Sequence, residues 1–193
     1  MLSPKKSLNI LKKTNALIEG HFVLSSGLHS AKYIQCAKLL SYPHLSNSIC
    51  KSLAHKIRKN YKEIDLILAP AMGGIIIGYE IGKILKKETI FCERVDKKFK
   101  LRRGFNIKKK AKILIVEDVI TTGKSSLECV RLIKRFGGKF VGIACLINRS
   151  KKLRMSKKII SQVKLDIPVY KRNKLPTSLK NIQITKPGSR YLR

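Results

Sequence analysis

Two adjacent carboxylates, Glu117 and Asp118, stand between an apolar run at residues 112–116 and a Thr-Thr-Gly sequence at residues 121–123. Hydroxyl groups, a flexible glycine and the backbone N–H groups of a helix start together make a pocket for a phosphate monoester. Carboxylates beside such a pocket would repel the phosphate unless they accept hydrogen bonds from another part of the ligand, such as ribose hydroxyls. The pattern therefore predicts a site for a sugar phosphate.

The residues after this loop have the pattern of a helix whose amino end points back at the two acids. Ser125 and Glu128 form an S-x-x-E capping pair, and a glycine pair at residues 137–138 is expected to end the helix. The apolar residues that recur on one helical face are Leu127, Val130 and Ile133.

The Gly-Lys-Ser sequence at residues 123–125 also looks like the end of a nucleotide-binding P-loop. That motif requires an earlier glycine at position 118, where this chain has Asp118. The sequence therefore excludes a Walker A site.

Four apolar runs, each with helical pattern or loop between it and the next, indicate how the acids are held. They lie at residues 64–69, 89–92, 112–116 and 140–147. Strands that alternate with helices predict an α/β fold with a mainly parallel sheet. Because ligands bind at the carboxyl ends of such strands, function is expected at residues 70–74, from 93 onward, from 117 onward and at 148–149.

Two further helices are expected nearer the amino end. The apolar residues Leu45, Ile49, Leu53 and Ile57 follow Pro43 with helical spacing and predict a helix that runs to about Asn60. A first helix is expected from the spacing of Leu8, Leu11 and Ile18, with Gly20 as its end.

Composition limits the class of protein. With 193 residues and 44% hydrophobic residues, one compact domain is expected over residues 1–193, and no apolar run is long enough to span a bilayer. The five cysteines are widely spaced and mostly lie in apolar stretches, which favours reduced thiols in a cytoplasm. The four histidines lack the spacing of a zinc site, so any metal is expected to arrive with the substrate.

The formal net charge of +32 would attract nucleic acid, acidic membranes or small polyanions. The alternative is that lysines decorate solvated faces, because they are spread along the whole chain. Charge alone leaves both interpretations open.

The motifs together resemble a known family. Residues 116–123, Val-Glu-Asp-Val-Ile-Thr-Thr-Gly, are similar to the phosphoribosyl pyrophosphate motif of type I phosphoribosyltransferases. Residues 20–30 with Tyr33 and Gln35, then 93–96 and 101–105, resemble the orotate-specific branch. The resemblance covers roughly residues 8 to 150 and implies that family's fold, with a small N-terminal hood at 1–40, a mobile loop at 95–111 and a basic C-terminal extension at 151–193.

The resemblance also implies roles for residues. Glu117 and Asp118 would hold the ribose hydroxyls, and the loop after residue 70 would touch pyrophosphate through its backbone. The residues expected to bind phosphoribosyl pyrophosphate are Glu117, Asp118, Val119, Ile120, Thr121, Thr122, Gly123, Lys124, Ser125, Met72 and Gly73. Thr121 and Arg149 are expected to bind orotate, because a guanidinium fork suits its carboxylate.

Transfer at the anomeric carbon builds positive charge on ribose and negative charge on the departing pyrophosphate. Catalysis is therefore expected from positioning, Mg²⁺ and preorganised cations rather than from a covalent nucleophile. The loop cations expected to act are Arg94, Lys98, Arg102 and Arg103. The resemblance further implies a homodimer in which the loop acts across the interface.

The chain departs from the family pattern at three places. Ser25 replaces a lysine, Ala31 replaces a frequent acid, and no histidine follows His55, although the family's loop often carries one. Two alternatives stay open: a phosphoribosyltransferase for another base, and an RNA-binding regulator built on the same fold. Otherwise nucleic acid is expected to bind only non-specifically, through charge.

Overall fold

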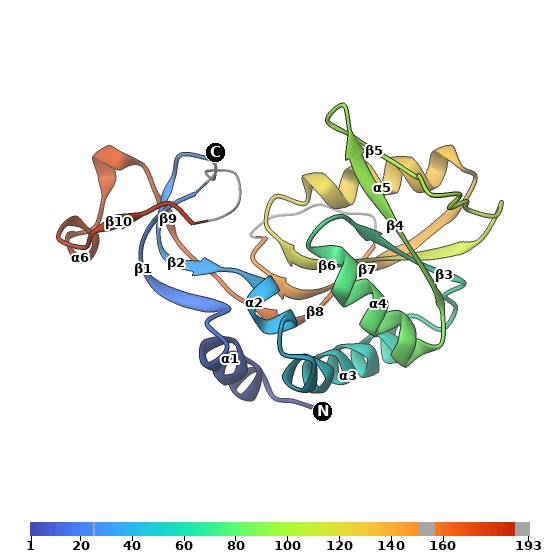
Figure 1. Cartoon of the computed structure of the whole chain (residues 1–193), viewed down its shortest axis with the longest axis horizontal. Coiled ribbons are helices and arrows are strands. Elements are labelled where there is room, and N and C mark those ends of the chain that lie inside the picture. Colours follow the sequence, from blue (N-terminus) through green and yellow to red (C-terminus); the bar gives the residue numbers. More distant parts are fainter. Residues whose placement is uncertain (25, 151–156, 188–193) are drawn as a thin grey trace.

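The computed structural model describes residues 1–24, 26–150 and 157–187, which form a large sheet with helices on both faces and a smaller sheet beside it (Figure 1). The large sheet contains six strands in the order β5-β4-β3-β6-β7-β8. These strands are β3 (Leu66–Pro70), β4 (Glu88–Val95), β5 (Lys98–Lys100), β6 (Lys112–Ile120), β7 (Lys139–Asn148) and β8 (Ile159–Lys164).

Strand direction in the large sheet confirms the predicted fold class. Neighbouring strands from β4 to β8 run parallel, and only β5 pairs antiparallel, as the second arm of a hairpin with β4. The four strands expected from apolar runs are all present, within a few residues of their expected bounds.

Helices cover both faces of this sheet (Figure 1). The helices α3 (Pro43–Asn60) and α4 (Gly74–Leu85) pack on one face, and α5 (Lys124–Arg135) packs on the other. The helix predicted to run from Pro43 to about Asn60 is confirmed at both ends, with Pro43 in its first turn.

The central strand β6 shows why the sheet is apolar on both faces. Leu114 and Val116 join the core under α3 and α4, whereas Ile113 and Ile115 join the core under α5. All four are fully buried, and each such side chain stabilises the fold by about 1.5–3 kcal/mol relative to exposure. This packing fixes the strand that carries Glu117 and Asp118.

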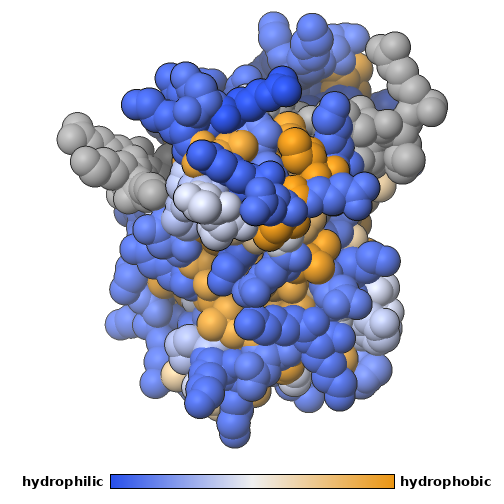
Figure 2. Space-filling model, turned by 90° about the vertical axis from the view of Figure 1, so that its left-hand side faces the viewer, coloured by the Kyte–Doolittle hydropathy of each residue, from blue (hydrophilic) through white to orange (hydrophobic). Residues whose placement is uncertain are grey.

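The smaller sheet, which we call the hood, has the order β10-β1-β2-β9. Its strands are β1 (Leu17–Val23), β2 (His29–Ile34), β9 (Val169–Tyr170) and β10 (Ile184–Thr185). Short helical segments flank it: α1 (Pro4–Lys13), α2 (Cys36–Leu40), η1 (Arg172–Lys174) and α6 (Thr177–Lys180). The face on the hood side is largely hydrophilic, with smaller apolar areas between the polar side chains (Figure 2).

The first helix is shorter than predicted. It ends at Lys13, and Ile18 belongs to β1 instead of the helix, so the expected end at Gly20 is wrong. Asn15 adopts a left-handed conformation with φ 52°, and the N–H of Ala16 donates to the carbonyl of Leu11 at 2.8 Å. This local turn ends the helix early because its N–H groups donate to the last helical carbonyls.

The predicted C-terminal extension contributes to both sheets. It supplies β8 to the large sheet and β9 and β10 to the hood, where His21 pairs with Ile184. Ser25, residues 151–156 and residues 188–193 lie outside the described residues. In the part of the chain that the structure describes, no helix is long and apolar enough to cross a membrane.

Candidate active site

The site lies where the chain changes direction across the large sheet. From β3 the chain passes to β4 on one side, and it later returns to β6 on the other side of β3. The loops that follow β3 and β6 therefore diverge, and a crevice between them is the expected place for a ligand.

Strand β6 continues further than its apolar run predicts. Its pairing with β3 stops at Leu68 and Ile115, whereas its pairing with β7 continues to Ile120 and Asn148. Glu117 and Asp118 are thus strand residues on an edge that β3 leaves open. A bound molecule can reach this edge without breaking the sheet.

The loop after β3 lies directly against Asp118. A β-carbon added at Gly73 would stand 2.5 Å from Oδ2 of Asp118, and one added at Gly74 would stand 3.1 Å from the carbonyl oxygen of Val116. The loop is held from the other side by the N–H of Ala71, which donates to the carbonyl of Cys92 at 2.8 Å. A side chain at position 73 would collide with the carboxylate, so the loop or Asp118 would have to move.

Glu117 is 7% exposed, and the hydroxyl of the fully buried Ser126 donates a hydrogen bond to its Oε1. Burial raises the pKa of Glu117 to about 7, and the hydrogen bond from Ser126 opposes that rise. The pKa of Asp118 is also raised by burial, and the N–H of Val119, which donates to Oδ1 at 2.8 Å, opposes it. Both acids are thus held in defined positions with raised pKa values.

The loop at residues 121–123 turns into α5 two residues earlier than the capping pattern predicts. Gly123 is the N-cap, with φ 73°, and Ser125 lies inside the first turn, so the predicted Ser125–Glu128 capping box is wrong. The left-handed glycine makes the turn, and as N-cap it has no side chain to cap the helix. The Thr122 hydroxyl accepts a long hydrogen bond, 3.4 Å, from the N–H of Lys124. The helix start therefore remains suited to an anion.

The buried face of α5 also differs from the prediction. Leu127 is 37% exposed, and the buried residues are Ser126, Cys129, Leu132 and Ile133. The helix begins at Lys124, and this places Ser126 over Glu117 instead of turning Leu127 into the core. The glycine pair correctly predicts its end, because α5 ends at Arg135 and Gly137 adopts φ 75°.

Arg94 on β4 contacts the first turns of α5. Its Nη1 lies 2.7 Å from Oε2 of Glu128, and its Nη2 donates to the hydroxyl of Ser125 at 3.4 Å. The guanidinium also stacks over Phe99, 4.1 Å from the ring centre. Glu128, expected to cap α5, instead holds Arg94 beside Ser125.

The other three predicted loop cations lie at or near the surface. Arg103 makes two hydrogen bonds to Glu93, at 3.0 and 3.1 Å, while Lys98 and Arg102 are exposed. The loop turns at Asp96 and Lys97, whose φ angles are 52° and 64°, before β5 begins.

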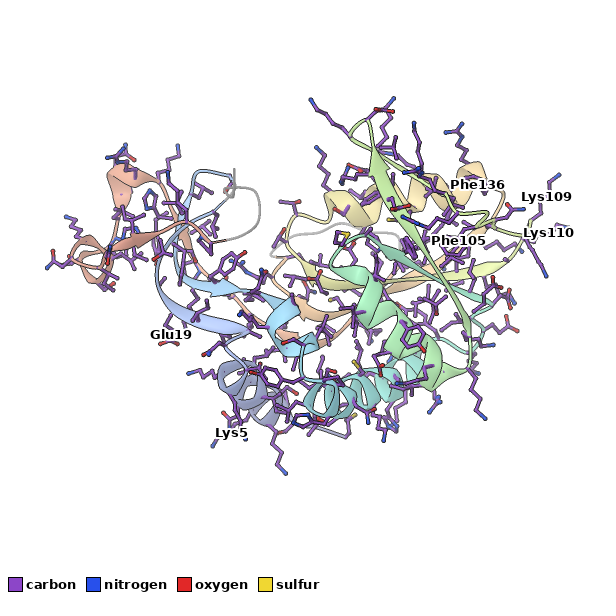
Figure 3. All side chains as sticks on the ribbon, viewed as in Figure 1. Lys5, Glu19, Phe105, Lys109, Lys110 and Phe136 are labelled. Atoms are coloured by element: carbon purple, nitrogen blue, oxygen red, sulfur yellow. The ribbon has the colours of Figure 1, made fainter. Side chains whose placement is uncertain are left out.

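Residues 101–111 pack part of their side chains against the large sheet. Ile107 is 3% exposed, and Phe105 meets Phe91 edge to face, with ring centres 5.1 Å apart. Lys109 and Lys110 project outward at the side of the molecule far from the hood (Figure 3). Movement of the loop at 95–111 stays a prediction.

Arg149 follows β7 and is joined to the end of β6. Its N–H donates to the carbonyl of Ile120 at 2.8 Å, so it lies beside the residue that precedes Thr121. The side chain is half-buried, and the loss of hydration lowers the pKa of the guanidinium. The structure thus brings the two predicted orotate-binding residues to neighbouring strand ends.

Three residues at the site have roles that sequence reasoning did not predict. Ser126 donates a hydrogen bond to Glu117. Tyr33 lies near Asp118, because its pKa is raised first by burial and then by the charge of Asp118. The Cys36 thiol lies 4.0 Å from the carbonyl oxygen of Asp118. Tyr33 was part of the quoted orotate-branch motif, which was a usable signal. Nothing in the sequence indicated Ser126 or Cys36.

Among the described residues, no three His, Cys, Asp or Glu side chains group closely enough to hold a metal ion. The site offers two acidic side chains and backbone donors rather than a complete set of metal ligands.

Comparison with known proteins agrees with this geometry. Residues 43–179 match the model of the phosphoribosyl transferase domain. The orotate phosphoribosyltransferase of Parvibaculum lavamentivorans is 44% identical over 193 residues, covering 99% of this chain and 100% of that protein. The enzyme of the same name from Caldicellulosiruptor saccharolyticus is 42% identical over 187 residues, covering 96% and 97%.

Solved structures share the fold at lower identity. Orotate phosphoribosyltransferase from Aeropyrum pernix superimposes with a TM-score of 0.73 at 23% identity, covering 81% of this chain and 92% of that one. Adenine phosphoribosyltransferase from Thermoanaerobacter pseudethanolicus gives 0.60 at 21% identity, covering 69% and 88%. At these identities the superpositions concern the fold alone.

Proposed function

Because the chain belongs to the phosphoribosyltransferase family and, within it, to the orotate phosphoribosyltransferases, we propose how its own residues carry out that reaction. The enzyme is a glycosyltransferase of pyrimidine nucleotide synthesis. It transfers the ribose 5-phosphate group of 5-phosphoribosyl 1-diphosphate to orotate and yields orotidine 5′-phosphate and diphosphate.

The observation that carries the proposal is the open edge of β6 beside the start of α5, whose N-cap is Gly123. Glu117 and Asp118 accept hydrogen bonds from the ribose hydroxyls, and the N–H groups and hydroxyls of residues 121–125 bind the 5-phosphate. Val119 and Ile120 continue the strand between these two groups. The backbone around Met72 and Gly73 faces the pyrophosphate, which requires the close approach that glycine permits.

Chemistry at the anomeric carbon is helped by charge and position. The bond from carbon to pyrophosphate weakens while orotate nitrogen approaches, so positive charge develops on the ribose ring. The carboxylates that fix the ribose also lie near this charge, and cations near pyrophosphate stabilise the departing group. No described side chain is needed as a covalent nucleophile.

The loop cations fall into two groups, those exposed to solvent and one that is held by neighbouring side chains. The ion pair of Arg103 with Glu93 is solvent-exposed and therefore weak, so Arg103 can exchange Glu93 for pyrophosphate. Lys98 and Arg102, which are exposed, are proposed to act with it after loop closure. Arg94, predicted as catalytic, is held by Glu128 and Ser125, and its proposed role is to position the phosphate loop.

Mg²⁺ is the proposed cofactor. Among the described residues the two carboxylates have no third acidic partner, which suits an ion that is bound mainly by the oxygens of the pyrophosphate substrate. When bound there, Mg²⁺ would neutralise charge on the departing pyrophosphate. Glu117 and Asp118 are the side chains that could contribute to its coordination.

Arg149 and Thr121 are the proposed orotate contacts. The half-buried guanidinium can form two parallel hydrogen bonds to the orotate carboxylate, an interaction that uracil cannot make. This pair is the basis for choosing orotate over other bases.

A homodimer is proposed from an exposed apolar strip next to the site. Met72 is 82% exposed, Ile76 51% and Tyr79 65%, and their spacing places them along the loop and the outer side of α4. A second copy that covers this strip would lie against the pyrophosphate loop. Sedimentation should give a dimer for the natural chain and for the control Tyr42→Glu, and a monomer for Tyr79→Glu. A monomeric natural chain would exclude the proposed homodimer.

A cytoplasmic location is proposed from the five cysteines, all buried and none in a disulfide among the described residues. Nucleic acid is proposed to bind only non-specifically, through the net charge of +32.

The test of the function is a panel of bases with phosphoribosyl diphosphate and Mg²⁺. Orotate should be converted to its nucleotide, and uracil, adenine and hypoxanthine should not. Conversion of a different base would move the enzyme to another branch of the family. Tight, salt-sensitive RNA binding with no turnover of any base would favour the regulator instead.

A further inference from the structure

A groove of about 340 Å³ lies between the β4–β5 hairpin and the outer side of α5. Its apolar residues are Phe99 and Leu132, which are 8% and 7% exposed. Its volume falls within the roughly 300–1,000 Å³ of small-molecule sites. None of its residues is among those proposed to bind the ribose phosphate, although Lys98 is also a proposed loop cation and Glu128 holds Arg94.

Cations border this groove. They are Lys97, Lys98, Arg131 and Arg135. None of them forms an ion pair with a carboxylate in the described part of the chain. The one acid that lines the groove, Glu128, is already engaged by Arg94 at 2.7 Å. The groove therefore presents an uncompensated positive field above an apolar floor.

A ligand that fits must combine an anion with a flat apolar part. Lysine and arginine side chains bind phosphate oxygens, and a guanidinium also stacks on planar rings. The nearby stack of Arg94 on Phe99 shows this kind of contact in the same place. The cations border one groove of small-molecule size, which suits a mononucleotide better than a polymer.

We propose that this groove is a second binding site, which shares Lys98 with the proposed catalytic loop but none of the ribose-phosphate residues, and that it takes a nucleoside monophosphate. The phosphate lies among the lysines and arginines, and the base lies over Phe99 and Leu132. Because the lining residues come from both the hairpin and α5, the ligand would join these two elements.

The test is calorimetric titration of uridine 5′-monophosphate into protein saturated with phosphoribosyl diphosphate and Mg²⁺, without orotate. The active site is then occupied, and a single nucleotide per chain should still bind. Arg131→Ala with Arg135→Ala should weaken that binding roughly tenfold or more, because two charge-assisted contacts are lost. The matched control, Lys134→Ala on the same helix, should change it by less than about twofold. All variants should keep normal turnover.

Several results would overturn the proposal: no binding once phosphoribosyl diphosphate is present, equal weakening in the control, or equally tight binding of uridine or of inorganic phosphate. Binding of a single-stranded oligonucleotide without binding of the mononucleotide would do the same. The result is independent of the proposed reaction, because failure of that reaction would appear as no turnover of orotate, whereas this titration measures nucleotide binding.

Discussion

The hydroxyl of Ser126 donates a hydrogen bond to Oε1 of Glu117, and both side chains are buried where α5 crosses β6. Burial raises the pKa of Glu117 to about 7, so the carboxylate is only partly ionised near neutral pH. Ser126 favours the ionised form because its hydroxyl donates to the carboxylate. The pair sets the pH range in which Glu117 can accept hydrogen bonds from ribose.

The first prediction concerns this pH range. In the natural enzyme, kcat/KM for phosphoribosyl diphosphate should fall as the pH drops through about 7, because protonated Glu117 accepts ribose hydroxyls poorly. Ser126→Ala should move this acid limb to higher pH, since the hydrogen bond that lowers the pKa is lost. Ser125→Ala, the matched control, should weaken substrate binding and leave the limb in place. An unmoved limb in Ser126→Ala would refute the role of the hydrogen bond.

The same residue should make folding stability depend on pH. The pKa of Glu117 rises from 4.5 to about 7 on folding, so its stabilising contribution is fully present below 4.5 and is lost as pH rises through 7. At high pH the free energy of unfolding is lower by about 3 kcal/mol for this reason. Glu117→Gln should therefore gain stability relative to the natural chain between about pH 5 and about pH 8 in urea unfolding. A constant difference would contradict this.

A side chain at position 73 should impair substrate binding. In Gly73→Ala the new carbon would meet Oδ2 of Asp118 at 2.5 Å, so the carboxylate or the loop must move. We expect KM for phosphoribosyl diphosphate to rise roughly tenfold or more, because misplacement by about 1 Å is costly at a reacting site. The unfolding temperature should change little, since Gly73 is exposed. Normal kinetics in a folded variant would show that the two loops do not cooperate.

Arg94 and Glu128 should act as a unit. Glu128→Ala should reproduce most of the rise in KM for phosphoribosyl diphosphate that Arg94→Ala causes, because each change removes the ion pair that holds the guanidinium beside Ser125. The double variant should be little worse, with a coupling energy of about 1 kcal/mol or more. Additive effects, or a fall in kcat confined to Arg94→Ala, would instead assign Arg94 a direct contact with pyrophosphate.

Arg149 should determine the choice of base. Arg149→Ala should raise KM for orotate by roughly 10- to 100-fold, which corresponds to loss of a charge-assisted contact of about 1.5–3 kcal/mol. The KM for orotate of Arg149→Lys should lie between those of the natural enzyme and Arg149→Ala, because lysine keeps the charge and loses the planar fork. An unchanged KM for orotate would remove Arg149 from the site.

The parts of the site that could be predicted from the sequence are contiguous in the chain. Glu117, Asp118 and the loop through Ser125 follow one another, so an apolar strand and a glycine-bearing turn were enough to locate them. The helix from Pro43 to Asn60 was equally clear, because its apolar spacing and its proline agree.

Other features depend on contacts between distant parts of the chain. The hood strands β9 and β10 contain two residues each, too few for a periodic signal, and they form by pairing with β1 and β2. The capping pattern at Ser125 and Glu128 was misleading, because Gly123 is the N-cap of α5 and Glu128 forms an ion pair with Arg94. The buried hydrogen bond from Ser126 to Glu117 forms only because α5 crosses β6 at this point, and the sequence does not show that crossing.

The most direct measurement is the loss of orotate absorbance with phosphoribosyl diphosphate and Mg²⁺ present or omitted in turn. The natural enzyme should consume orotate only when both are present. The double variant Glu117→Ala with Asp118→Ala should be about a hundredfold slower or worse, and Glu88→Ala, an exposed acid at the far end of β4, should be unaffected. Undiminished turnover in the double variant, or none in the folded natural enzyme, would contradict the assignment of this site.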